Sequence, residues 1–154
     1  MRKWGVRGGT TGGKGECVGN PKQPSMSEKD NVRYVRSLWA AIEEGGLEGA
    51  LEMTEPGVEW KPHAAGGKVL TSEELLRFFH EFQGQRQLLE ARPYSFDARG
   101  DIVLASGSFR LRGESLVEFQ IHFVYEFEDG RLVRATTYAS RREALTAAGI
   151  DANP

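Results

Sequence analysis

The side chains with catalytic potential are few in this sequence and lie far apart. Its three histidines are His63, His80 and His122, and its single cysteine is Cys17. No two histidines stand four residues apart on a predicted helix, and no cysteine accompanies them, as metal ligands commonly would. A dinucleotide fingerprint is also missing from the sequence. We therefore predict no metal site and no cofactor.

Glu59 and His63 are the best remaining candidates for acid/base catalysis. Glu59 lies on a short predicted strand, Val58 to Lys61, which Pro62 ends, and His63 lies in the loop after it. A carboxylate beside an apolar wall has a raised pKa and can act as a general base. An isolated glutamate is more often a solvated strand residue, so both interpretations of Glu59 stay open.

The segment from Gly8 to Lys14 matches a phosphate-binding loop only in part. Gly15 stands where Ser or Thr would ligate magnesium, and neither a hydrophobic strand nor a helix pattern surrounds the match. Residues 1–25 are rich in glycine and lack apolar periodicity, which predicts a disordered tail. Residues 26–150 are predicted to form one domain, and residues 151–154 a short tail.

The composition argues against several classes of protein. The chain carries 20 Lys and Arg against 22 Asp and Glu, which favours neither nucleic acid nor an anionic membrane as a partner. No apolar run approaches the roughly 18 residues of a membrane helix. A single cysteine can form no internal disulfide. These features are typical of a cytoplasmic protein.

Apolar spacing predicts helices in the first half of the domain and strands in the second. The helices cover about residues 27–45, 47–53 and 72–82, and Thr71 with Glu74 forms a capping box before the third. Period-two alternation then predicts strands over about 88–97, 102–112, 116–127 and 131–140, followed by a short last helix. Such an order is typical of an α+β domain in which a curved, mixed or antiparallel sheet wraps the helices.

The last two strands form a hairpin whose register can be read from its turn. Asp129-Gly130 supplies the positive φ angles of a type I′ turn. Because strand side chains alternate, one face of the first strand carries the apolar residues Val117, Phe119, Ile121, Phe123, Tyr125 and Phe127.

Several short motifs, in this order, resemble one known family. They are Gly45-Gly46-Leu47, Val58 to Pro62, Glu73-Glu74-Leu75 with Phe78-Phe79, Asp129 to Leu132, and Arg142 to Leu145. Over about residues 29 to 150 the chain resembles the SnoaL-like branch of the nuclear transport factor 2-like superfamily. The resemblance implies a cone in which a bent sheet and helices enclose a pocket. Members include polyketide cyclases, ketosteroid isomerases, limonene epoxide hydrolases and domains that only bind or associate, so fold alone does not select a function.

The resemblance draws attention to Gln120 and His122, because SnoaL-type cyclases carry a Gln-x-His pair on this strand. In that pattern the histidine and an aspartate lie equally far before and after the hairpin glycine. The same count from Gly130 reaches Phe123 and Thr137. The pair is thus one residue out of register and on the opposite face, unless a bulge reverses the parity. We predict His122 to be a surface or subunit-interface residue.

The catalytic positions of the other enzymes also lack their usual groups here. The resemblance places the general base of ketosteroid isomerases near Lys61, which would need a strongly lowered pKa to act. The hydrogen-bond donors of those isomerases and the triad of the epoxide hydrolases map to Leu38, Phe123, Val103, Ala105 and Thr137.

What remains is an expected pocket with apolar walls. The predicted wall residues are Val35, Leu38, Trp39, Val103, Ala105, Ile121, Phe123, Ala135 and Thr137. They either fill the core or surround a small apolar molecule oriented by Thr137, and the sequence leaves both possibilities open. An isomerase, polyketide cyclase or epoxide hydrolase-like enzyme that uses Glu59 or His63 is an alternative.

A purely structural dimerisation domain is a third interpretation. Antiparallel sheets often leave one face free for a partner. On the family resemblance we expect a homodimer that meets through the outer sheet face, which carries Leu116, Glu118, Gln120, His122 and Val124.

Overall fold

The computed structural model describes residues 26–150 and confirms an α+β fold. The elements are α1 (Met26–Leu51), β1 (Glu59–Lys61), the 3-10 helix η1 (His63–Ala65), α2 (Ser72–Gln83), β2 (Gln87–Arg99), β3 (Ile102–Arg112), β4 (Leu116–Glu128), β5 (Arg131–Tyr138) and α3 (Arg141–Ala148). The predicted disordered tail, its partial phosphate-loop match and the tail at 151–154 lie outside the described residues.

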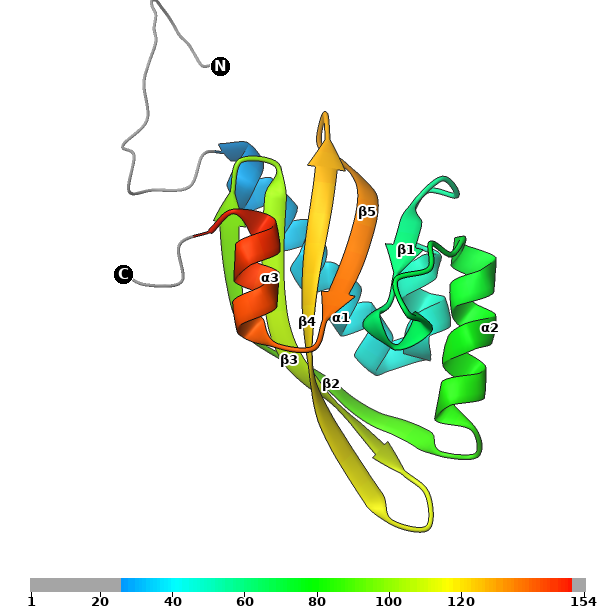
Figure 1. Ribbon diagram of the computed structural model, residues 1–154. Helices are drawn as coiled ribbons and strands as arrows, with labels where there is room; N and C mark the ends of the chain where they lie inside the picture. Colours follow the sequence, from blue (N-terminus) through cyan, green and yellow to red (C-terminus); the bar gives the residue numbers. More distant parts are fainter. Residues whose placement is uncertain (1–25, 151–154) are drawn as a thin grey trace, which may run out of the picture.

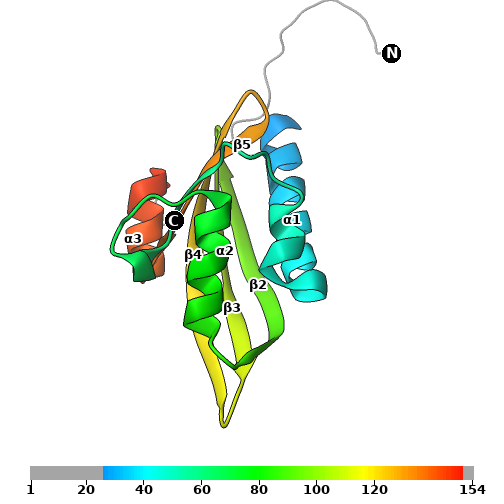
Figure 2. The same ribbon diagram turned by 90° about the vertical axis from the view of Figure 1, so that its right-hand side faces the viewer.

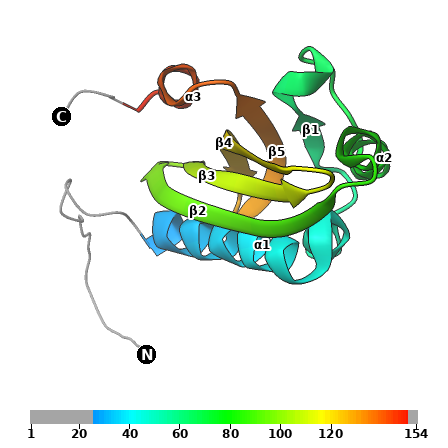
Figure 3. The same ribbon diagram turned by 90° about the horizontal axis from the view of Figure 1, so that it is seen from below.

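The strands form one strongly bent mixed sheet in the order β1-β5-β4-β3-β2 (Figure 1). β1 runs parallel to β5, and the other neighbours are antiparallel. Seen from below, β2 curves along α1 (Figure 3). Helices α1 and α2 lie on one side of the sheet and α3 lies on the other (Figure 2). We call the side of α1 and α2 the inner face and the side of α3 the outer face.

Local signals in the sequence account for the helix boundaries. Gly46 has a φ of 74° and kinks α1, which therefore consists of two helical pieces, as the Gly45-Gly46 pair predicts. At the start of α2 the backbone N–H of Glu74 donates to Oγ1 of Thr71 over 3.1 Å. The Glu74 side chain accepts in return from the Thr71 backbone N–H over 2.9 Å, which completes the capping box. No helix in residues 26–150 is long and apolar enough to cross a bilayer.

The β4–β5 hairpin turns at Asp129-Gly130 as predicted, and Glu128 pairs with Arg131 beside the turn. Asp129 and Gly130 both have positive φ angles, 51° and 78°. Phe123 pairs with Thr137. A β-bulge at Val133 of β5 shifts the pairing by one residue and so brings Thr137 rather than Thr136 opposite Phe123. The alternation along β4 is unchanged. The odd-numbered residues of β4 therefore face α1 and α2.

A separate small core lies on the outer face beneath α3. It consists of Leu104, Val124, Ala144, Leu145 and Ala148. The main core fills the space between the inner face and the two longer helices. The sheet is thus covered on both sides over part of its area.

His122 lies beneath the first residues of α3, and its prediction as a surface or interface residue is wrong. Only 6% of the residue is exposed, and its Nδ1 lies 2.8 Å from Oγ of Ser106. Arg141 donates to the same Oγ over 3.2 Å and to a carboxylate oxygen of Asp97 over 2.9 Å. Strand parity placed His122 on the outer face correctly, but it does not reveal that α3 folds back over that face.

This environment predicts a pH-dependent contribution of His122 to stability. Burial, and then the Arg141 guanidinium, lower the pKa of His122. Because the folded pKa is below the unfolded one, the stabilisation is complete above the unfolded pKa and declines as pH falls through the folded value. The free energy of unfolding should therefore fall more steeply from about pH 7 to pH 5 in the wild type than in His122→Gln.

Urea unfolding at a series of pH values measures this difference. The matched control is His63→Gln, which makes the same substitution at an exposed histidine. If the free energy of unfolding depends on pH equally in the wild type and in His122→Gln, the lowered pKa of His122 is contradicted.

Candidate functional site

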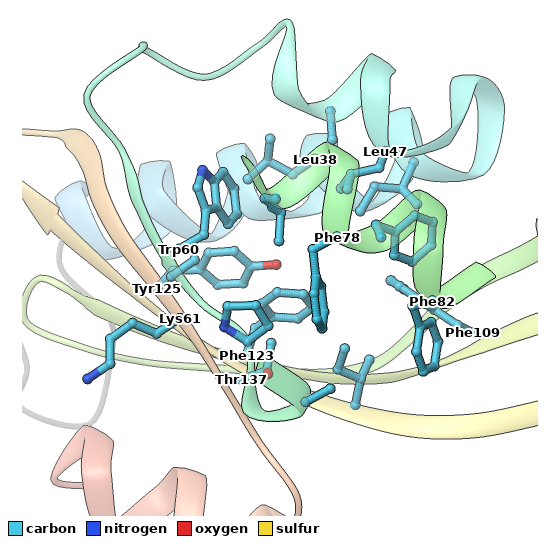
Figure 4. Close-up of a pocket in the computed structure, with 18 of the residues that line it drawn as sticks. Leu38, Leu47, Trp60, Lys61, Phe78, Phe82, Phe109, Phe123, Tyr125 and Thr137 are labelled. Atoms are coloured by element: carbon cyan, nitrogen blue, oxygen red, sulfur yellow. The ribbon is translucent and has the colours of Figure 1, made fainter. Parts of the chain in front are cut away.

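The inner face of the sheet, α1, α2 and the segment around η1 enclose a cavity of about 120 Å³ (Figure 4). The α1 helix contributes Leu38, Ile42, Leu47 and Ala50 to its wall, and α2 contributes Leu75, Phe78, Phe79 and Phe82. Strands β3, β4 and β5 contribute Phe109, Phe119, Ile121, Phe123, Tyr125, Ala135 and Thr137. Trp60, Lys61, Pro62 and Ala64 complete the lining.

Aromatic rings dominate this wall and hold one another in place. Phe109 makes an edge-to-face contact with Phe119 at 5.7 Å between ring centroids, and Phe119 makes another with Phe82 at 5.6 Å. Phe123 stacks on Tyr125 at 5.2 Å. Such contacts stabilise a ring beyond its area burial, so the wall is preformed.

Four lining residues carry polar side-chain groups. The indole N–H of Trp60 donates to Oγ of Ser72 over 3.0 Å. The hydroxyl of Tyr125 accepts a hydrogen bond from Nε1 of Trp39 over 3.1 Å, and burial raises the pKa of Tyr125. Oγ1 of Thr137 accepts one from the backbone N–H of His63 over 2.6 Å. The amine of Lys61 points away from the cavity (Figure 4). The hydroxyl groups of the cavity are therefore two neutral ones, and apolar side chains surround them.

The predicted wall residues divide into two groups. Leu38, Ile121, Phe123, Ala135 and Thr137 line the cavity. Val35, Trp39, Val103 and Ala105 are fully buried in the main core but do not line it. Trp39 supports the wall from behind, where its ring contacts Phe109 and Phe123 edge to face.

The wall from α2 was missing from the sequence-based list. Leu75, Phe78, Phe79 and Phe82 follow the helical spacing of a buried stripe, which predicts one apolar face. That spacing cannot say which part of the sheet the face will cover. Phe119 and Tyr125 could have been included, because they share the strand face of Phe123.

Neither Glu59 nor His63 places its titratable side chain in the cavity wall. Glu59 receives hydrogen bonds from Arg134 Nη2 over 2.9 Å and Nε over 3.1 Å, and its side chain is 49% exposed. The neighbouring Trp60 turns inward instead. Only the backbone of His63 reaches Thr137. Within residues 26–150, no three His, Cys, Asp or Glu side chains are grouped to hold a metal ion.

The fold agrees with the comparison with protein families. The model of the SnoaL-like domain matches residues 35–135. The chain therefore belongs to the SnoaL-like domain family. A search of curated proteins gives no match.

Solved structures share the fold at low sequence identity. A nuclear transport factor 2-like protein of unknown function from Burkholderia pseudomallei K96243 is 21% identical, with a TM-score of 0.57 over 77% of this chain and 97% of that one. A proposed SnoaL-like polyketide cyclase from Jannaschia sp. CCS1 is 17% identical, with a TM-score of 0.60 over 86% and 99%. An epoxide hydrolase from M. tuberculosis, similar to limonene epoxide hydrolase, is 16% identical, with a TM-score of 0.59 over 81% and 89%.

Proposed function

We propose that this domain binds a small apolar molecule in its aromatic cavity. The observation that carries the proposal is the composition of the wall. Eight of its residues are aromatic, and none of the lining residues is Asp, Glu or His. Ligand sites are concave and mostly apolar, with a few polar groups that orient the ligand, and this cavity has that character.

The size of the cavity favours a molecule with one ring. An engineered apolar cavity of roughly 150 Å³ in another protein binds benzene. The cavity here is about 120 Å³, so a substituted benzene fits it better than a fused polycyclic molecule does.

An enzyme that uses Glu59 or His63 receives less support. Acid/base catalysis requires the reacting group within hydrogen-bond reach of the substrate. The Glu59 carboxylate is paired with Arg134 outside the cavity wall, and the His63 residue is exposed. The positions that correspond to catalytic residues of related enzymes hold Leu38, Phe123, Val103, Ala105 and Thr137, which are poor proton carriers.

Calorimetric titration with α-methylstyrene tests the proposal. Burial of this nine-carbon hydrocarbon should give a dissociation constant on the order of 0.1 to 1 mM. The heat capacity change should be negative, because apolar surface leaves water. A titration without saturable heat at two temperatures would argue against the proposed function.

We also propose that two copies associate through the part of the outer face that α3 leaves open. Leu116, Glu118 and Gln120 are exposed there, whereas His122 and Val124 of the predicted interface are covered by α3. Light scattering that gives the monomer mass at high protein concentration would contradict this association.

A further inference from the structure

The hydroxyl group of Tyr125 has one hydrogen-bonding function that the protein itself does not use. A phenol can both accept and donate a hydrogen bond. Its oxygen accepts from the Trp39 indole over 3.1 Å. No acceptor for the hydroxyl hydrogen is found among residues 26–150. A buried donor without a partner is costly, so this group is suited to meet a ligand.

The position of the hydroxyl fits such a role. Tyr125 is 2% exposed and belongs to the cavity wall. In Figure 4 its hydroxyl points into the space between Leu38 and Phe78. The ring itself is held by stacking on Phe123, and the Trp39 hydrogen bond fixes the oxygen. The donor is therefore preorganised.

Thr137 shows the same pattern on the neighbouring strand. Its Oγ1 accepts the backbone N–H of His63, and its own hydrogen has no acceptor within the described part of the chain. Both hydroxyl oxygens already accept a hydrogen bond, and both hydrogens stay available. Burial raises the pKa of Tyr125, which keeps that phenol protonated as a donor. The cavity thus offers donors inside an apolar wall, and its complement is a ring that carries an acceptor.

We propose that the cavity selects ligands with a ketone or aldehyde carbonyl on an apolar ring, and that the Tyr125 hydroxyl donates a hydrogen bond to the carbonyl oxygen. This inference rests on the proposed binding function and adds the chemical class of the ligand. A group that only donates hydrogen bonds finds no free acceptor at Tyr125, because Trp39 already occupies its oxygen. The carbonyl group of the ligand would be bound without any covalent reaction.

Two ligands of nearly equal shape test the assignment. Acetophenone carries a carbonyl oxygen where α-methylstyrene carries a methylene group. Calorimetry gives the dissociation constant of each for the wild type and for Tyr125→Phe. The variant should weaken the binding of acetophenone about tenfold relative to that of α-methylstyrene, because only the ketone loses a hydrogen bond. Thermal unfolding verifies that the variant is folded.

An infrared measurement provides a second readout on the same samples. The C=O stretching frequency of bound acetophenone should be lower in the wild type than in Tyr125→Phe, since a hydrogen bond weakens the carbonyl bond. Equal effects of the variant on both ligands, or an unchanged stretching frequency, would overturn the role of Tyr125 while the binding function stands. If neither ligand binds the wild type, the binding function itself fails, and the inference fails with it.

Discussion

Gly107→Ala is expected to lower the free energy of unfolding by about 3 kcal/mol. A Cβ atom at Gly107 would lie 2.4 Å from the carbonyl oxygen of Arg92 and 2.8 Å from Cα of Pro93. It would also lie 2.8 Å from Cη2 of Trp39. The first two atoms belong to the backbone of β2, next to the point after Pro93 where its pairing with β3 shifts by one residue. Either β2 or the Trp39 side chain of α1 must therefore shift to make room for the added methyl group.

Gly45→Ala is the matched control for this substitution. No atom lies within 4 Å of a Cβ at Gly45, and its φ is not positive. Alanine in a helix is more stable than glycine by about 0.5 to 1 kcal/mol, so this variant should be slightly stabilised. Urea unfolding measures both variants. A Gly107→Ala protein as stable as Gly45→Ala would contradict the close approach of β2 and Trp39 to Gly107.

Ile121→Trp is expected to weaken the binding of α-methylstyrene at least tenfold, to about the limit of detection. Ile121 lines the cavity from the middle of β4 and is only half-buried, so a larger side chain can turn inward without breaking the sheet. An indole there would occupy much of the 120 Å³ that a ring ligand needs. Calorimetric titration of the variant measures the loss.

Gln120→Trp introduces the same indole one residue earlier. Because neighbouring strand residues face opposite sides, this side chain lies on the exposed outer face. The variant should bind α-methylstyrene with the wild-type affinity. If both variants lose binding, or neither does, the ligand does not occupy the cavity beneath Ile121.

Features encoded over a few residues could be predicted from the sequence. The Asp129-Gly130 turn determines the pairing of Glu128 with Arg131 at the start of the hairpin, because both turn residues adopt positive φ angles. The capping box of Thr71 and Glu74 determines the start of α2. These interactions are local, so residue types and spacing are sufficient to identify them.

Features that depend on the approach of distant segments could not be predicted in this way. The hydrogen bond between Trp39 and Tyr125 joins residues 86 positions apart. The aromatic stripe of α2 forms a cavity wall only because that helix lies across the inner face. The cover of α3 over His122 likewise depends on the path of the chain after β5.

The most direct test of an apolar binding cavity is methyl NMR during a titration with α-methylstyrene. We expect saturable shift changes at methyl groups that line the cavity, among them those of Leu38, Ile42, Leu47, Ile121 and Thr137. The methyl groups of Leu104, Val124 and Leu145, which lie beneath α3 on the other side of the sheet, should stay unchanged. No shift at the cavity methyl groups, or changes confined to the α3 side, would contradict it.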